Sequence, residues 1–216
     1  MKRVFGAFEA AFDLLYLTAA IVIGLVLLFS AGGSPARALA GVMALVLAGG
    51  DAFHLLPRVR VCMTGNEAPL RRALGRGKQI ASITMAVFYV LLFRIGLLLF
   101  TPGHSAPWSG TVAALTALRV ILCLLPQNQW EERYPPVSWG IWRNIPFFLQ
   151  GMLVAGLFFR FRAAAQGLGL AWLAIVLSFL FYLPVVLWAN QNPKIGMLML
   201  PKTCAYLWLL TMCLSL

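Results

Sequence analysis

The segment Phe8–Ser30 reads FEAAFDLLYLTAAIVIGLVLLFS and decides the class of fold. Every residue from 19 to 29 is apolar or glycine. A helix needs about 20 mostly apolar residues to cross the hydrocarbon core of a bilayer. The segment therefore predicts a membrane-spanning helix. Glu9 and Asp13, near its start, place two carboxylates at the edge of that span.

The composition extends this prediction to the whole chain. The 216 residues are 62% hydrophobic and 11% charged, whereas a soluble domain is about 45–50% apolar and about 25% charged. The net charge of +11 comes mostly from lysines and arginines between apolar segments. That placement favours contact with anionic lipid headgroups over nucleic-acid binding. We predict one all-α membrane domain over residues 1–216, with membrane lipids and no nucleic acid among its partners.

Six further segments are long and apolar enough to be membrane spans, so the sequence predicts a polytopic transmembrane bundle of seven helices. The predicted ranges are 8–30, 37–56, 79–100, 109–125, 139–159, 168–189 and 195–216. Pro57 is expected to end the second helix and Pro126 the fourth, because proline cannot donate the helical hydrogen bond. Residues 58–78 are expected to form a polar, basic loop.

Positive charge is divided unequally between the two sets of loops. With the N terminus in the cytoplasm, the outer side carries only Arg37, Arg160 and Arg162. The cytoplasmic side then carries Lys2, Arg3, Arg58, Arg60, Arg71, Arg72, Arg76, Lys78, Arg133, Arg143 and Lys194. Because cytoplasmic loops are enriched in lysine and arginine, we predict a cytoplasmic N terminus and an outside C terminus.

The segment Gly50–Arg58, GDAFHLLPR, brings ionisable groups into a predicted span. Asp51, His54 and Arg58 stand at positions i, i+3 and i+7, one stripe of a helix. Such groups cost roughly 2.5–3.5 kcal/mol each at the centre of a membrane helix, so we expect them to serve a function. Histidine exchanges protons near neutral pH. Asp51 and His54 are therefore the candidate catalytic or recognition pair.

Every predicted helix contributes polar groups to the cytoplasmic half of the membrane. The candidate binding residues are Glu9, Asp13, Tyr16, Arg58, Lys78, Ser82, Arg143, Asn144, Asn190 and Lys202. We interpret them as the lining of a polar pocket open to the cytoplasm. Structural ion pairs and side chains that extend toward the headgroups are the alternative interpretation. Arg94 and Arg119 lie deep in predicted spans and have no predicted acidic partner.

No cofactor and no metal site is predicted. The chain has two histidines and neither an HxxH nor an HExxH motif, and His104 is expected on the opposite side of the membrane from His54. Phosphate-loop, dinucleotide and Gly-x-Ser-x-Gly motifs are also absent from the sequence. The sequence leaves the ligand, the oligomeric state and the presence of enzymatic activity open.

Several stretches resemble a known group of proteins. They are Glu9–Tyr16, Gly50–Arg58, Gly77–Met85, Leu124–Asn128, Trp142–Phe147 and Gly196–Tyr206. The last stretch overlaps the run MLMLPKTCAYLW, residues 197–208. These stretches are similar to an uncharacterised family of multi-pass membrane proteins found mainly in Gram-positive bacteria, and the similarity spans most of the chain. The resemblance implies a seven-helix topology and a location in the bacterial cytoplasmic (inner) membrane. It implies no activity.

The sequence favours a membrane protein whose polar pocket binds or modifies an amphipathic or anionic small molecule or a lipid headgroup. Arg58, Arg143 and Lys202 would receive the negative charge of the ligand. Two alternatives remain. One is a proton-coupled transporter or carrier, because intramembrane acids commonly couple transport to protons. The other is a non-catalytic sensor or assembly subunit, in which the charges pair with each other or with a partner.

Overall fold

The structure, a computed structural model, describes the chain except Met1, Pro102, His104 and Gln166. Its long helices are α1 (Lys2–Phe29), α2 (Pro35–Thr64), α3 (Arg71–Phe100), α4 (Ser105–Leu124), α5 (Val137–Arg160), α6 (Ala171–Trp188) and α7 (Met199–Met212). Within the described residues, seven helical segments are long and apolar enough to cross a membrane, and there is no β-strand. The predicted all-α bundle of seven membrane-compatible helices is confirmed. The predicted position of His104 lies outside the described residues.

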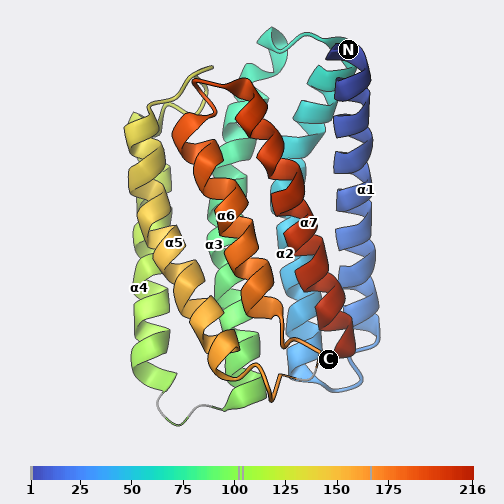
Figure 1. Cartoon of the computed structure of the whole chain (residues 1–216), viewed down its shortest axis with the longest axis vertical. Coiled ribbons are helices and arrows are strands. Elements are labelled where there is room, and N and C mark those ends of the chain that lie inside the picture. The colour runs from blue at the N-terminus through green and yellow to red at the C-terminus, as the bar shows by residue number, and fades with distance from the viewer. Residues whose placement is uncertain (1, 102, 104, 166) are drawn as a thin grey trace.

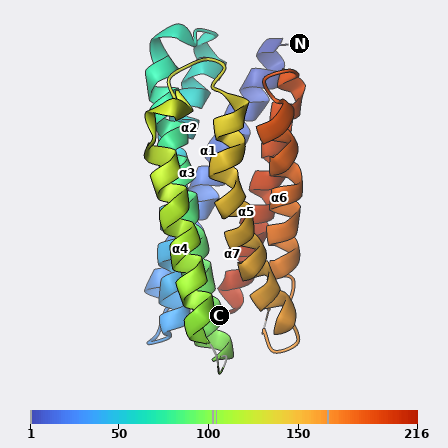
Figure 2. The same ribbon diagram turned by 90° about the vertical axis from the view of Figure 1, so that its left-hand side faces the viewer.

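Successive helices run in opposite directions along the long axis of the bundle, and the two termini lie at opposite ends (Figure 1). Helices that follow each other in the chain pack against each other, and α7 also contacts α1. α4 contacts both α3 and α5, which also contact each other, and it lies at the front of the bundle in Figure 2. We call the end where α1 begins the N-terminal end of the bundle. It carries the α2–α3, α4–α5 and α6–α7 connections.

The second and third helices are longer than the sequence predicted. α2 does not end before Pro57 but continues to Thr64, where Gly65 caps it in a left-handed conformation with φ of 73°. A 3₁₀ turn, Ala68–Leu70, leads directly into α3 at Arg71, so most of the predicted loop 58–78 is helical. Pro57 leaves the Phe53 carbonyl without its helical donor. The helix continues nevertheless, because packing against α3 holds this turn in place.

Glycines allow α2 and α3 to approach closely. A Cβ atom at Gly77 of α3 would lie 2.2 Å from the Phe53 carbonyl oxygen of α2. A Cβ atom at Gly50 of α2 would lie 1.9 Å from the Thr84 hydroxyl oxygen of α3. Small residues at a helix interface let two backbones pack tightly inside a membrane. Through these two contacts, the GDAFHLLPR segment of α2 (Gly50–Arg58) packs directly against the first half of α3.

The buried side chains change in character along the axis of the bundle. Toward the C-terminal end the core is aliphatic and aromatic, with fully buried Leu27, Met43, Leu92, Ile95, Phe158 and Leu209. A layer of rings from α3, α5, α6 and α7 occupies the middle, formed by Phe88, Tyr89, Phe147, Phe179 and Tyr206. Polar side chains are buried nearer the N-terminal end, among them Asp13, Arg119, Asn128, Asn144 and Lys202. The buried polar side chains therefore lie near the N-terminal end, and the core toward the C-terminal end is apolar.

Substitution of Gly77 by alanine is expected to destabilise the protein, because the new methyl group would overlap main-chain atoms that cannot rotate away. Overpacking of this kind costs about 1–3 kcal/mol. The matched control is Gly49→Ala in α2, where a Cβ atom meets nothing within 4 Å and alanine favours the helix by about 1 kcal/mol. Thermal unfolding of both variants in detergent compares them. A Gly77→Ala variant as stable as Gly49→Ala would contradict the close approach.

Candidate functional site

An acidic cluster lies between α1 and α2 near the N-terminal end of the bundle. It consists of Glu9, Asp13, Tyr16, Asp51 and Arg58. The Tyr16 hydroxyl donates a 2.7 Å hydrogen bond to Oδ2 of Asp51, and Nε of Arg58 lies 2.7 Å from Oε1 of Glu9. Asp13 is 6% exposed and close enough to Glu9, Arg58 and Asp51 for electrostatic interaction. Because α1 and α2 are antiparallel, Tyr16 of α1 lies opposite Asp51 of α2. Glu9, two turns earlier in α1, lies opposite Arg58, two turns later in α2.

His54 belongs to a different helix interface from Asp51. Asp51 faces α1 through its bond to Tyr16, whereas His54 lies against α3 beside the main chain of Leu74 and Gly77. Nδ1 of His54 is buried and has no hydrogen-bond partner in the described part of the chain. The charged side chains that act on the ring are cations, namely Lys78, Arg58 and Lys202. No hydrogen bond joins Asp51 to His54 among the described residues.

A cationic cluster lies on the other side of the bundle, where α4 and α5 meet, and consists of Arg119, Asn128, Arg143 and Asn144. Arg119 is 1% exposed. Its Nη1 donates to the main-chain oxygen of Arg143 at 2.5 Å and to Oδ1 of Asn144 at 2.9 Å. The guanidinium carbon lies 4.1 Å from the centroid of the Phe147 ring. None of these partners carries a negative charge.

Arg143 extends the cationic cluster to the N-terminal end of the bundle. Its Nη1 donates to Oδ1 of Asn128 at 2.8 Å, and its guanidinium carbon lies 4.1 Å from the Trp130 ring centroid. Asn128 follows the end of α4, and its amide nitrogen donates to the carbonyls of Leu122 and Leu125 at 2.6 and 2.9 Å. These are carbonyls that a helix end leaves without helical donors. The amide is thereby oriented with its oxygen toward Arg143, whose Nε is buried without a partner in the described structure.

Lys202 lies between the two clusters. Its buried ammonium is 5.1 Å from the ring centroid of Tyr182 and 4.9 Å from that of Tyr206. It is close enough to Asp51 for electrostatic attraction, although the described side chains include no contact ion pair between the two. The Tyr182 hydroxyl donates to Oδ1 of Asn144 at 3.1 Å. Lys202 of α7 thus attracts Asp51 of the acidic cluster and lies over the Tyr182 ring of α6, which is hydrogen-bonded to Asn144 of the cationic cluster.

The remaining predicted residues lie at the edge of these clusters. Ser82 contributes its main-chain oxygen, which accepts a hydrogen bond from Nε of Arg119 at 3.4 Å. The side chain of Lys78 is exposed. Asn190 donates to the Pro135 carbonyl at 3.1 Å and so joins the α6–α7 connection to the α4–α5 connection. The contact of Asn190 is therefore one between two connections of the bundle.

Three residues of the network, Arg119, Asn128 and Tyr182, were not among the predicted site residues. Arg119 carried a sequence signal, because an arginine deep in a span needs a partner. Its partners are amide and main-chain oxygens, which a search for nearby acids does not detect. Arg94, the other deep arginine, has an exposed side chain on α3 and does not join the cluster.

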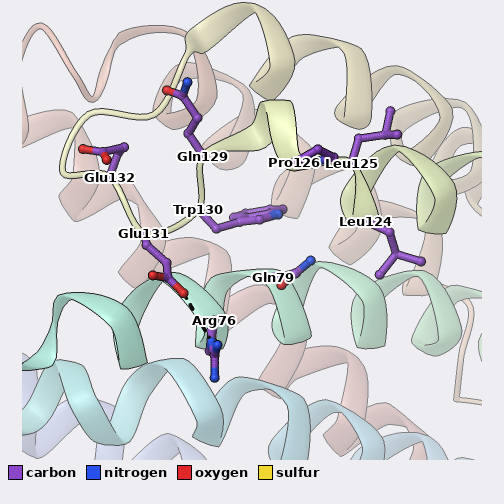
Figure 3. A pocket seen from close by; sticks show the side chains of 9 residues that line it. All are labelled: Arg76, Gln79, Leu124, Leu125, Pro126, Gln129, Trp130, Glu131 and Glu132. Atoms are coloured by element: carbon purple, nitrogen blue, oxygen red, sulfur yellow. Dashed lines mark hydrogen bonds and ion pairs between the residues drawn. The ribbon is translucent and has the colours of Figure 1, made fainter.

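A separate pocket opens at the N-terminal end of the bundle, between the first turns of α3 and the α4–α5 connection (Figure 3). Its volume is about 480 Å³, and its lining residues are Arg76, Gln79, Leu124, Leu125, Pro126, Gln129, Trp130, Glu131 and Glu132. No predicted site residue is part of this lining. Because Arg143 packs on the Trp130 ring and does not line the pocket, the indole separates the pocket from the cationic cluster. We call it the surface pocket.

The interior of the bundle thus holds buried charged side chains of both signs, with Asp13 in one cluster and Arg119 in the other. In the described part of the chain, no three His, Cys, Asp or Glu side chains come together in a way that could hold a metal ion. Comparison with known proteins gives no match: no family model, no curated protein and no solved structure is significantly similar to this chain.

The Tyr16–Asp51 hydrogen bond is expected to contribute measurably to stability, because hydrogen bonds to charged groups contribute about 1.5–3 kcal/mol. A double-mutant cycle of Tyr16→Phe and Asp51→Ala, followed by denaturant unfolding in mixed micelles, measures the coupling between the two side chains. We expect a coupling energy of about 1–3 kcal/mol. Tyr134→Phe is the control, because the Tyr134 side chain is 63% exposed. Additive effects of the two substitutions would contradict the bond.

Proposed function

We propose that the protein binds an anionic amphiphile and holds its negatively charged headgroup among the buried cations near the N-terminal end of the bundle. The observation that supports this most strongly is Arg119, which is 1% exposed and has only neutral partners within the described structure. A charge without a counter-charge in an apolar interior costs several kcal/mol even after relaxation. A bound anion would remove much of that cost.

Two further cations support the same conclusion. Arg143 has a buried Nε atom without a partner in the described chain. Lys202 is buried over two tyrosine rings rather than against a carboxylate. The contact ion pairs of the described residues involve only the carboxylates of Glu9 and Glu131, so no described carboxylate neutralises Arg143 or Lys202 by direct contact. Guanidinium groups bind phosphate and carboxylate strongly, often through two parallel hydrogen bonds.

We propose that Asp51 and His54 recognise or modify the ligand. Asp51 attracts Lys202 and shares a hydrogen bond with Tyr16, so it can exchange a proton with a group bound near the lysine. Nδ1 of His54 has no partner in the described structure and can accept a hydrogen bond from a ligand hydroxyl. The two residues would then act from two sides of α2 rather than as one directly bonded pair.

The alternative functions have less support. A proton-coupled carrier needs polar groups along its whole path, whereas the described buried side chains toward the C-terminal end are apolar beyond Gln150 and Ser178. Arg94 is exposed instead of extending such a path. A sensor or assembly subunit would use its charges for pairing alone. The unpartnered nitrogens of Arg143 and His54 favour a ligand over that role.

The proposal includes a location and an orientation: the bacterial cytoplasmic membrane, with the N-terminal end of the bundle in the cytoplasm. Its basis is the excess of lysine and arginine in the connections at that end. The resemblance to multi-pass proteins of Gram-positive bacteria supports the bacterial membrane. In this orientation the cationic and acidic clusters lie in the cytoplasmic half of the bilayer.

The orientation predicts the activity of reporter fusions in bacteria. Alkaline phosphatase fused after Leu216 is expected to be active, because the enzyme folds only outside the cytoplasm. Phosphatase fused after Gly65, in the α2–α3 connection, is expected to be inactive. Green fluorescent protein at the same two positions should show the opposite pattern. An active fusion after Gly65 would contradict the orientation.

Binding of an anionic amphiphile is expected to raise the thermal stability of the purified protein, because a ligand that binds only the folded state stabilises it. The probe is dodecyl phosphate, added to the protein in a neutral maltoside detergent. Arg143→Gln and Lys202→Gln are each expected to weaken its affinity at least about tenfold, which corresponds to about 1.4 kcal/mol.

The control for this experiment is Arg94→Gln, which removes a positive charge from an exposed position and should leave the affinity unchanged. Lys202→Arg retains the charge and should retain most of the binding even if Lys202→Gln unfolds. Dodecyltrimethylammonium serves as the cationic counterpart of the probe. Equal stabilisation by both detergents, or equal affinity in all variants, would refute the proposal.

A further inference from the structure

We infer that the surface pocket binds a zwitterion with a phosphate and an ammonium group, supplied as the headgroup of a membrane phospholipid. The pocket has a volume of about 480 Å³, within the range of about 300–1,000 Å³ that is usual for small-ligand sites. Its lining combines a cation, carboxylates and apolar side chains. Each of these three parts corresponds to one part of such a lipid.

The depth of the pocket matches that of lipid headgroups. α3 has 30 residues and is therefore about 45 Å long, whereas the hydrocarbon core of a bilayer is roughly 30 Å thick. Arg76 precedes the predicted span 79–100 and Gln79 is its first residue, so both are expected at the headgroup end of that span. Leu124 is the last residue of both α4 and its apolar span. The pocket thus lies where a span leaves the hydrocarbon core.

The charged side chains of the pocket are arranged as a dipole. Glu131 lies 3.3 Å from Nε of Arg76 and 3.4 Å from Nε of Arg72, and Glu132 is exposed on the same loop. Figure 3 shows Arg76 on α3 facing Glu131 on the α4–α5 connection. A phosphate beside Arg76 and an ammonium beside Glu131 and Glu132 would add an opposite charge at each end of this ion pair. A simple anion would instead be repelled by the two carboxylates.

The rest of the lining is preformed and partly apolar. Nε1 of Trp130 and the side-chain amide of Gln79 both donate to the Cys123 carbonyl, at 3.0 and 3.1 Å, so both side chains are held in place. Arg143 already covers one face of the indole. We assign ammonium recognition to the carboxylates of Glu131 and Glu132, because they carry the negative charge of the lining. The apolar residues Leu124, Leu125 and Pro126 are suited to the glycerol and the first methylenes of a lipid.

The experiment compares two lipids with identical acyl chains, phosphatidylethanolamine and phosphatidylglycerol, which differ in whether the headgroup carries an ammonium. Native mass spectrometry of the full chain in detergent measures how much of each lipid is retained. We expect a preference for phosphatidylethanolamine. The double variant Glu131→Gln/Glu132→Gln should reduce this preference at least about fivefold. Arg76→Gln should weaken retention of both lipids, because both carry the phosphate assigned to Arg76. All three side chains are exposed, so these variants are expected to fold.

Matched controls are Glu67→Gln and Arg60→Gln, which alter charges at the same end of the bundle but outside the pocket. Both should retain the wild-type preference. Soluble phosphoethanolamine, added as a competitor, distinguishes a lipid from a free headgroup. It should not displace the lipid, because it lacks the apolar part. Displacement by soluble phosphoethanolamine would overturn the assignment of a lipid source.

Equal retention of the two lipids by the wild-type protein, or an unchanged preference in the double variant, would overturn the inference as a whole. The comparison is repeated in the Lys202→Gln background, where the interior site no longer retains the anionic phosphatidylglycerol, so the result does not depend on the proposed function. Arg143→Gln and Lys202→Gln remove dodecyl phosphate binding in the interior, whereas the surface pocket contains neither residue. Failure at one site is therefore distinguishable from failure at the other.

Discussion

The central constraint in this structure is that a guanidinium buried in an apolar interior must have polar partners. Arg119 of α4 obtains them from the main chain of α3 and α5 and from the Asn144 amide. Asn144 in turn accepts from Tyr182 of α6. One buried cation thus sets the positions of four helices relative to each other, and this arrangement leaves a positive charge without a counter-charge inside the bundle.

The two ends of the bundle differ because polar side chains are unequally distributed along the helices. Toward the C-terminal end, aliphatic and aromatic side chains fill the core, and association there depends on packing. Toward the N-terminal end, the same helices carry carboxylates, amides and cations that bond across helix interfaces. Glycines at positions 50 and 77 let α2 and α3 approach each other closely at this end. The polar interior is therefore confined to one end of the bundle, and the proposed ligand binding rests on this asymmetry.

The helices themselves could be predicted from hydropathy, and their number and approximate positions agree with the structure. The end of α2 and the start of α3 could not be predicted. Pro57 and the charged residues after it indicate a loop when only the local sequence is considered. Contact with α3 overrides that local preference. Similarly, the sequence showed that Arg119 has no acidic partner nearby, but it did not show which groups bind the guanidinium. Amide and carbonyl oxygens occur in every segment, so the sequence does not show which of them a guanidinium will reach.

What the sequence by itself determined is the class of fold and the end of the bundle at which polar side chains gather. Both follow from local properties, namely the length of apolar runs and the position of a residue within its run. Only the tertiary structure decided that Asp51 bonds Tyr16, that His54 faces α3 and that Lys202 lies between two tyrosine rings. Those contacts depend on how far each helix is rotated about its own axis. That rotation is set by packing against neighbours that are distant in the chain.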